Sequence, residues 1–258
     1  FDALALLALV AGVFHTINHA IFKSLLFLGA GALFFKTHTR DIEKYGGLIK
    51  LMPWTAALFL VGAVAISGLP PFNGFASEWL TFQTMFAGVA LGLGMKVQSL
   101  WIGATIALAL TSGLAAACFV KAFGVSFLGR ARTDVAKSAT EVSFTMIGPM
   151  VVLAVLCLVF GVFSSTSVIP YLSAVLQNFV LATSVSSWPT LASMPTPWGF
   201  DLSNLWAFGI LVILGLLVVG FVRIWGGKRT VTRDIPWDCG VDITPRMEIS
   251  ASAFSRSL

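Results

Sequence analysis

A chain of 258 residues that is 57% hydrophobic and only 10% charged is too apolar for a soluble domain, which carries about 25% charged residues. The mean hydropathy of +0.93 points the same way, and we therefore interpret long apolar runs as membrane spans of roughly 20 residues. The net charge of +5 is explained by the loops between such spans, without a nucleic-acid partner.

The first two apolar elements differ in their continuity. The first runs from about residue 4 to residue 35, which is longer than a perpendicular span needs at about 1.5 Å per residue, so it is tilted, protruding or broken. After a polar loop at 36–50, the second covers about 51–93. Its middle holds residues that cannot continue a helix, in the order Ser67-Gly68-Leu69-Pro70-Pro71-Phe72-Asn73-Gly74. We predict two half-helices separated by a break at Pro70, Pro71, Asn73 and Gly74.

Three more spans follow, at about 100–128, 142–163 and 205–225. The segment 169–182 has helical spacing but is short for a span, so we place it flat at the membrane interface, with Trp188, Trp198 and Trp206 as anchors of that level. The sequence predicts an all-α integral membrane protein with about five transmembrane helices, the second discontinuous, plus an interfacial helix. We divide it into a transmembrane domain, 1–225, and a polar tail, 226–258.

Lysine and arginine indicate the orientation, because cytoplasmic loops carry the excess of these residues. If the interrupted element crosses once, Lys96 lies on one side and thirteen of the sixteen basic residues lie on the other. The thirteen are Lys36, Arg40, Lys44, Lys50, Arg130, Arg132, Lys137, Arg223, Lys228, Arg229, Arg233, Arg246 and Arg256. This pattern predicts five crossings of the inner (cell) membrane, with the N-terminus outside and the tail in the cytoplasm.

Redox chemistry is not expected within this chain. Cys118, Cys157 and Cys239 are far apart, and no CxxC pair suggests iron–sulfur or nickel ligation. We therefore expect no disulfide, cofactor or metal.

The chain starts at Phe1 and enters an apolar run at once, so we also expect it to be part of a longer protein.

The first helix carries the strongest chemical signal. His15, His19 and Lys23 recur every four residues and therefore stack along one face, about 6 Å apart. An ionisable group in hydrocarbon costs at least about 2.5 kcal/mol, so each needs a partner or a purpose. Imidazole accepts a proton on one nitrogen and releases one from the other, which makes the row a candidate proton relay.

Two other interpretations of the histidines are possible. A single buried histidine is more often a hydrogen-bonded core residue, although three titratable groups on one stripe favour the relay. The HxxxH spacing is also a usable metal-ligand pair, but it needs more ligands, and His38 in the loop is the one remaining histidine.

The break in the second element indicates a polar cavity, since unwound backbone at membrane depth is tolerated only against protein or water. Glu78 follows the break, and Asn73 or Ser77 could cap the second half-helix. We expect the Glu78 carboxylate to face Lys23 as a switchable pair; the alternative is a packing kink with Glu78 reaching the headgroups. Lys121, in the third span, either continues the path or reaches the headgroups by snorkelling.

These residues carry a family resemblance. The first helix, with His15-Thr16-Ile17-Asn18-His19-Ala20-Ile21-Phe22-Lys23-Ser24-Leu25-Leu26-Phe27-Leu28, resembles the antiporter-like subunits of respiratory complex I, membrane-bound [NiFe] hydrogenases and multisubunit cation/proton antiporters. The segments Lys44-Tyr45-Gly46-Gly47-Leu48 and Gly68-Leu69-Pro70-Pro71-Phe72-Asn73-Gly74-Phe75-Ala76-Ser77-Glu78 match the same family. The resemblance implies that Lys23 and Glu78 take part in proton transfer, with His15 and His19 along the polar axis between them. Some relatives place a lysine where Glu78 stands.

The C-terminal region narrows the resemblance. Trp237-Asp238-Cys239-Gly240, Arg246-Met247 and Ser252-Ala253-Phe254-Ser255 are similar to the large membrane subunit of group 4 [NiFe] hydrogenases, of the hydrogenase-4 and formate hydrogenlyase type. The chain would then be the C-terminal half of such a subunit. Its partners would be other membrane subunits, the lipid bilayer, and iron–sulfur or [NiFe] hydrogenase-like subunits on the cytoplasmic face.

The expected function is proton translocation in a redox-driven complex, with no catalytic residue in this chain. One alternative is a sodium/proton antiporter subunit that uses the same helices. Another is a structural anchor that docks redox subunits on its basic face. The last alternative, a histidine-rich membrane enzyme, is disfavoured because three histidines cannot build a diiron site.

Overall fold

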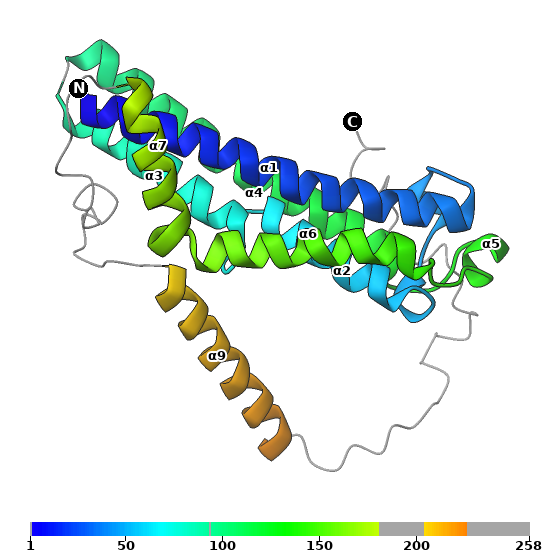
Figure 1. Ribbon diagram of the computed structural model, residues 1–258. Helices are drawn as coiled ribbons and strands as arrows, with labels where there is room; N and C mark the ends of the chain where they lie inside the picture. Colours follow the sequence, from blue (N-terminus) through cyan, green and yellow to red (C-terminus); the bar gives the residue numbers. More distant parts are fainter. Residues whose placement is uncertain (1, 93, 181–203, 226–258) are drawn as a thin grey trace.

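The computed structural model describes residues 2–92, 94–180 and 204–225, and the regular structure of these residues is entirely helical (Figure 1). The α-helices of this described part are α1 (Asp2–Thr37), α2 (Pro53–Ile66), α3 (Asn73–Ala90), α4 (Met95–Phe127), α5 (Asp134–Lys137), α6 (Phe144–Val162), α7 (Ile169–Val180) and α9 (Asn204–Trp225). Two 3-10 turns, Ile42–Lys44 and Leu48–Lys50, precede α2, and a π-helical turn, Ser164–Val168, joins α6 to α7.

Within the described residues, three helices are long and apolar enough to cross a membrane: Leu4–Thr37, Met95–Phe127 and Phe144–Val162. Each coincides with a predicted span, and the fifth predicted span corresponds to α9. The chain is thus an all-helical membrane protein. The number of five spans is not confirmed, because the second predicted span is divided into α2, a shorter apolar helix, and α3.

The interruption of the second element is confirmed, whereas a break in the first is not. The helix α1 is continuous over 36 residues, a length of about 54 Å. The helix α2 ends at Ile66 and α3 begins at Asn73. The helix α3 lies along the N-terminal part of α1 and α2 along its C-terminal part (Figure 1).

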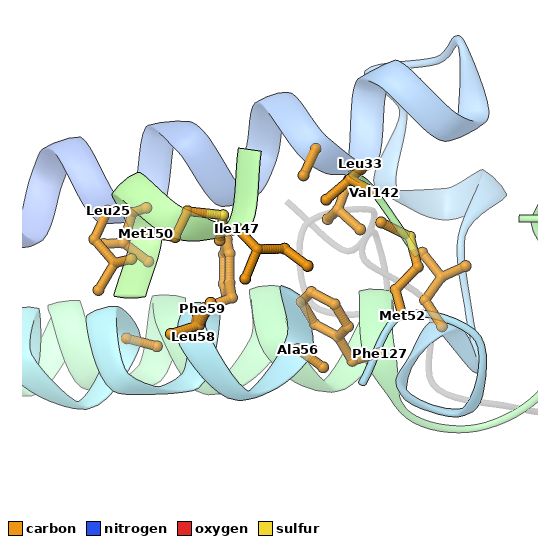
Figure 2. Close-up of a cluster of buried hydrophobic side chains, with 14 of the residues drawn as sticks. Leu25, Leu33, Met52, Ala56, Leu58, Phe59, Phe127, Val142, Ile147 and Met150 are labelled. Carbon is orange, nitrogen blue, oxygen red and sulfur yellow. The ribbon is translucent and has the colours of Figure 1, made fainter. Parts of the chain in front are cut away.

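Two apolar clusters pack around α1. The N-terminal cluster joins α1 to α3 and α7 and contains Leu6, Leu7, Val10, Ala11, Phe14, Ala76, Leu80 and Ile169. The larger C-terminal cluster joins α1, α2, α4 and α6, with members such as Leu25, Phe59, Phe127 and Met150 (Figure 2). The α1 residues from His15 to Asn18 lie between the two clusters and belong to neither of them.

The loops after α1 and α4 meet at one end of the bundle. The backbone N–H groups of Gly46 and Gly47 donate to the carbonyls of Ser126 and Leu128. Both glycines have positive φ, and a Cβ on Gly46 would lie 2.2 Å from the Arg130 carbonyl oxygen, so glycine is required at this close approach. The basic residues of the two loops therefore share one end of the molecule.

Glu141 ties α2 to the same end. Its Oε2 accepts from the backbone N–H of Trp54 at 2.8 Å, and its Oε1 accepts from the Thr55 hydroxyl at 2.6 Å. A carboxylate from the segment before α6 thus caps the first turn of α2, where the helix dipole favours negative charge. Sequence reasoning did not identify this cap.

The predictions for α7 and for the C-terminal part of the chain stay untested. The helix α7 packs on α1 and supplies Ile169 to the N-terminal cluster, while its place at the membrane interface stays a prediction. Trp188, Trp198, Cys239 and the tail 226–258 lie outside the described residues.

Candidate functional site

The predicted stripe is present at the middle of α1. The ring centroids of His15 and His19 are 6.0 Å apart, and the His19 ring packs edge-on against Phe22 at 5.1 Å. His15 and Lys23 are half-buried, whereas His19 is exposed within this chain. The Lys23 ammonium lies 5.7 Å from the centroid of the Phe27 ring, within the range of a cation–π contact.

His15 connects the stripe to the break. Its Nδ1 lies 3.1 Å from the Ser77 hydroxyl, and that hydroxyl is also 3.1 Å from the Asn73 carbonyl oxygen. The tautomer of His15 decides which group donates, since Ser77 can donate to a bare Nδ1 or accept from a protonated one while donating to Asn73. A hydroxyl with this choice can pass a proton without moving far.

Asn18 and Asn73 form a buried reciprocal pair. The Asn18 amide donates to the Asn73 carbonyl at 3.0 Å, and the Asn73 amide donates to Asn18 Oδ1 at 3.2 Å. Neither side chain is exposed to solvent. The pair fastens the first residue of α3 to the centre of α1, and Asn73 Oδ1 is buried with no hydrogen-bond partner among the described residues. We refer to His15, Asn18, Asn73 and Ser77 as the polar belt.

The predicted caps of α3 are wrong. Phe72 is the N-cap residue, and no side chain caps the helix. Asn73 is already helical, and its amide is used in the pair with Asn18, while the Ser77 hydroxyl bonds back to Asn73 and to His15. These residues connect helices instead of terminating one.

Glu78 and Lys23 do not form the expected direct pair. The Glu78 Oε2 accepts from the Ser112 hydroxyl of α4 at 2.8 Å. A Cβ added to Gly68 would lie 2.4 Å from the same oxygen, so the carboxylate packs against the break. Among the described residues, ion pairs join Lys44 to Asp41 in the loop after α1, and Lys137 to Asp134 within α5. The carboxylate is instead hydrogen-bonded to Ser112, on a helix much later in the chain.

Small residues allow the break to pack tightly. A Cβ on Gly161 of α6 would lie 2.1 Å from the Pro71 carbonyl oxygen, and one on Gly74 would lie 1.7 Å from the carbonyl oxygen of Ala65. The Pro70–Pro71 peptide bond is cis. The break is therefore enclosed by α6 as well as by α1, as unwound backbone at membrane depth requires.

The two other candidate residues lie apart from the belt. Lys121 is half-buried on α4 and makes no hydrogen bond or ion pair with the described residues, and the structure gives no preference between its two interpretations. His38 follows the end of α1 at Thr37, far along the helix from His15 and His19. Within the described residues, His38 therefore does not join His15 and His19 in a group that could hold a metal ion.

A hydrogen bond connects the imidazole row of α1 to the helix that carries Glu78. It joins His15 to the Ser77 hydroxyl, which also bonds the Asn73 carbonyl, while the Glu78 carboxylate, next in the chain, is bonded to Ser112 of α4. Neighbouring hydrogen bonds polarise one another in a low-dielectric interior. Sequence reasoning missed Ser112, Gly68 and Gly161 as members of this site, and it assigned Ser77 only a capping role.

Comparison with known proteins identifies the same region. The family described as NADH:quinone oxidoreductase/Mrp antiporter, TM, matches residues 3–102. The chain is 38% identical to hydrogenase-4 component B of Escherichia coli (strain K12), covering 92% of this chain and 35% of that protein. It is 37% identical to formate hydrogenlyase subunit 3 of the same strain, covering 98% of this chain and 39% of the relative.

A solved structure shares the fold. A chain of the membrane-bound sulfane sulfur reductase, an archaeal respiratory membrane complex, superposes with a TM-score of 0.66 and 24% identity, over 94% of this chain and 37% of that one. The chain thus spans little more than a third of the length of these relatives, which are parts of multisubunit assemblies. The helices α1, α2 and α3, with the break between them, lie in the matched segment, and through residues 3–102 this chain belongs to the NADH:quinone oxidoreductase/Mrp antiporter transmembrane family.

Proposed function

We propose that this chain moves protons across the membrane as an antiporter-like subunit of a redox-driven complex of the hydrogenase or complex I type. The observation that carries the proposal is the contact between His15 Nδ1 and the Ser77 hydroxyl, which joins the imidazole row of α1 to the turn bearing Glu78. The family match and the hydrogenase relatives support it.

In this proposal the titratable groups act in sequence. His15, His19 and Lys23 form the part of the path on α1, and Glu78 forms the part at the break. Because Glu78 is held by Ser112, Lys23 and Glu78 act at separate positions, and a change of charge or hydration at one alters proton occupancy at the other. Lys121 on α4 extends the path toward the basic end. No cofactor is needed in this chain.

The basic loops suggest the orientation of the path. The loops that contain residues 36–50 and 128–143 are hydrogen-bonded to each other. Lys96 lies at the opposite end of α4 from these loops. By the positive-inside rule, the shared basic end faces the cytoplasm. We infer five crossings within 1–225, an external N-terminus and a cytoplasmic tail, 226–258. The redox partners, iron–sulfur or [NiFe] subunits, would dock on the cytoplasmic face, and other membrane subunits alongside the helices.

Replacement of the Lys23 ammonium tests the proposal. In the complete complex reconstituted in vesicles, Lys23→Ala should abolish redox-driven acidification, measured with a pH-sensitive dye, while the complex still assembles. Lys96→Ala is the matched control, since this exposed lysine lies at the far end of α4 and should leave acidification unchanged. Normal pumping in Lys23→Ala would reject the proposal. If joint neutralisation of His15, His19 and Glu78 also left coupling intact, the chain would be a structural anchor.

A second function is favoured by the inclusion of Mrp antiporters in the matched family. A sodium/proton antiporter subunit would use the same helices without a redox partner. Vesicles without an electron donor would then show a sodium-dependent dye response that Lys23→Ala removes. A response that requires the electron donor and ignores sodium supports the redox-driven proposal instead.

A further inference from the structure

We propose that Ser112 of α4 is the positioning residue for Glu78, and that its hydroxyl completes a hydrogen bond to the carboxyl group in both protonation states. This inference rests on the proposed function, in which Glu78 gains and loses a proton. The Ser112 hydroxyl oxygen lies 2.8 Å from Glu78 Oε2, across the interface between α3 and α4.

The hydroxyl has a second acceptor within reach. It lies 3.0 Å from the carbonyl oxygen of Leu108, one turn earlier on its own helix. When Glu78 is ionised, the Ser112 O–H donates to Oε2 in a charge-assisted bond. When Glu78 is protonated on Oε2, the carboxyl O–H donates to Ser112 Oγ, and the Ser112 proton turns to Leu108. Rotation of one O–H bond thus satisfies both states without moving either helix.

The carboxylate also packs against Gly68 of the break. This glycine has a φ of +63°, and an added Cβ would lie 2.4 Å from Glu78 Oε2 and 3.3 Å from Oε1. The absence of a side chain at Gly68 leaves the space that the carboxylate fills, and the positive φ disfavours any other residue there. The break and α4 therefore both contact the Glu78 carboxylate.

Exposure separates Ser112 from its two neighbours on α4. The neighbouring Thr111 and Gly113 are exposed, whereas Ser112 is half-buried against α3. The Thr111 hydroxyl donates to the Ala107 carbonyl at 2.8 Å, the same bond one turn back that Ser112 makes to Leu108, but it has no acidic partner. Thr111 is therefore a control that makes the same bond to its own helix but is exposed and does not contact Glu78.

The experiment uses infrared difference spectroscopy on the membrane-embedded complex. Spectra taken at acid and alkaline pH reveal the C=O band of the protonated Glu78, assigned by its loss in Glu78→Gln. We expect Ser112→Ala to shift this band to higher frequency, because the carboxyl group loses its hydrogen-bond partner. Ser112→Thr restores the hydroxyl and should return the band to its wild-type position, and Thr111→Ala should not move it.

Transport is measured on the same variants. We expect a loss of about tenfold in the acidification rate for Ser112→Ala, the factor that corresponds to one charge-assisted hydrogen bond of about 1.4 kcal/mol, and recovery in Ser112→Thr. A Glu78 band that Ser112→Ala leaves in place overturns the role of Ser112, whatever the transport rate. Unchanged transport in Glu78→Gln refutes the proposed use of Glu78 instead, and the band still reports whether Ser112 contacts it.

Discussion

The polar belt and the C-terminal apolar cluster lie next to each other along α1, yet they are held by different forces. In the cluster, Leu25, Phe59, Phe127 and Met150 exclude polar groups and fix the helices by shape (Figure 2). In the belt, Asn18 and Asn73 are as deeply buried as the cluster residues, and they fix α1 to α3 by hydrogen bonds. The comparison shows how one helix, α1, can pack through apolar contacts at one level and through buried hydrogen bonds at the next.

Hydrogen bonding explains why polar residues are tolerated in the belt. The chain leaves the helical pattern between Ile66 and Asn73, and the carbonyl of Asn73, the first residue of α3, accepts from the Asn18 amide and the Ser77 hydroxyl. A buried polar group costs about 1 to 3 kcal/mol when unpaired but little when bonded, so the break and the belt depend on each other. The apolar cluster consists of hydrophobic side chains and needs no such hydrogen bonds.

The largest expected effect on stability lies in the apolar cluster. Phe127 is fully buried, with ring centroids 5.4 Å from Phe59 and 5.1 Å from Phe123. Phe127→Ala leaves a cavity and should lower the free energy of unfolding by about 3 to 5 kcal/mol. Thermal unfolding in detergent, followed by circular dichroism, measures the loss. Phe144→Ala removes the same ring from a site that is 81% exposed and should change little.

The comparison predicts that this loss of stability is separate from transport. At a temperature where Phe127→Ala remains folded, its acidification rate per assembled complex should match the wild type, since the cluster holds none of the proposed proton carriers. A folded Phe127→Ala complex without transport would show that the two regions do not act independently.

A second expected effect lies where α6 covers the break. In Gly161→Ala the new methyl group meets the Pro71 carbonyl oxygen at 2.1 Å and the Phe72 carbonyl carbon at 2.6 Å, which are backbone atoms that cannot rotate away. We expect a loss of stability of about 1 to 3 kcal/mol together with loss of transport, because the break is displaced. Thermal unfolding and acidification measure the two effects.

Gly31→Ala is the control for this substitution. Gly31 lies in α1 with open space where a Cβ would stand, and alanine is the better helix former there. It should be neutral or slightly stabilising. Equal transport in Gly161→Ala and the wild type would mean that the geometry of the break does not matter for the path.

Helix boundaries were largely predictable from the sequence, because apolar runs and prolines act locally. The predicted spans at 142–163 and 205–225 agree closely with α6 and α9, and the interruption after Ile66 follows from Gly68, Pro70 and Pro71. The stripe of His15, His19 and Lys23 also depends only on helical periodicity. These features need no knowledge of which helices are neighbours.

The partners across helices were not predictable in this way. Nothing in the spacing around Ser112 distinguishes it from Thr111, and only the packing of α4 on α3 turns it toward Glu78. Gly161 gave no signal either, since glycine at the end of a helix is ordinary. The expected pairing of Glu78 with Lys23 was wrong because it assumed that opposite charges lie close together. The Glu78 carboxylate is instead hydrogen-bonded to the neutral hydroxyl of Ser112.

The smallest expected effect concerns the Asn18–Asn73 pair. Asn18→Ala removes the donor to the Asn73 carbonyl and leaves the Asn73 amide only its longer bond, 3.5 Å, to the backbone carbonyl of residue 18, so we expect a stability loss of about 1 to 2 kcal/mol. Asn73→Ala should cost a similar amount. If the two side chains act as one unit, the double variant should be less destabilised than the sum of the single variants, by at least about 0.5 kcal/mol in a double-mutant cycle. Additive losses would mean that each amide is held by something other than its partner, and the belt would then be a set of separate contacts. A non-additive loss, with transport reduced in both single variants, would tie the hydrogen-bonded anchoring of the break to the movement of protons.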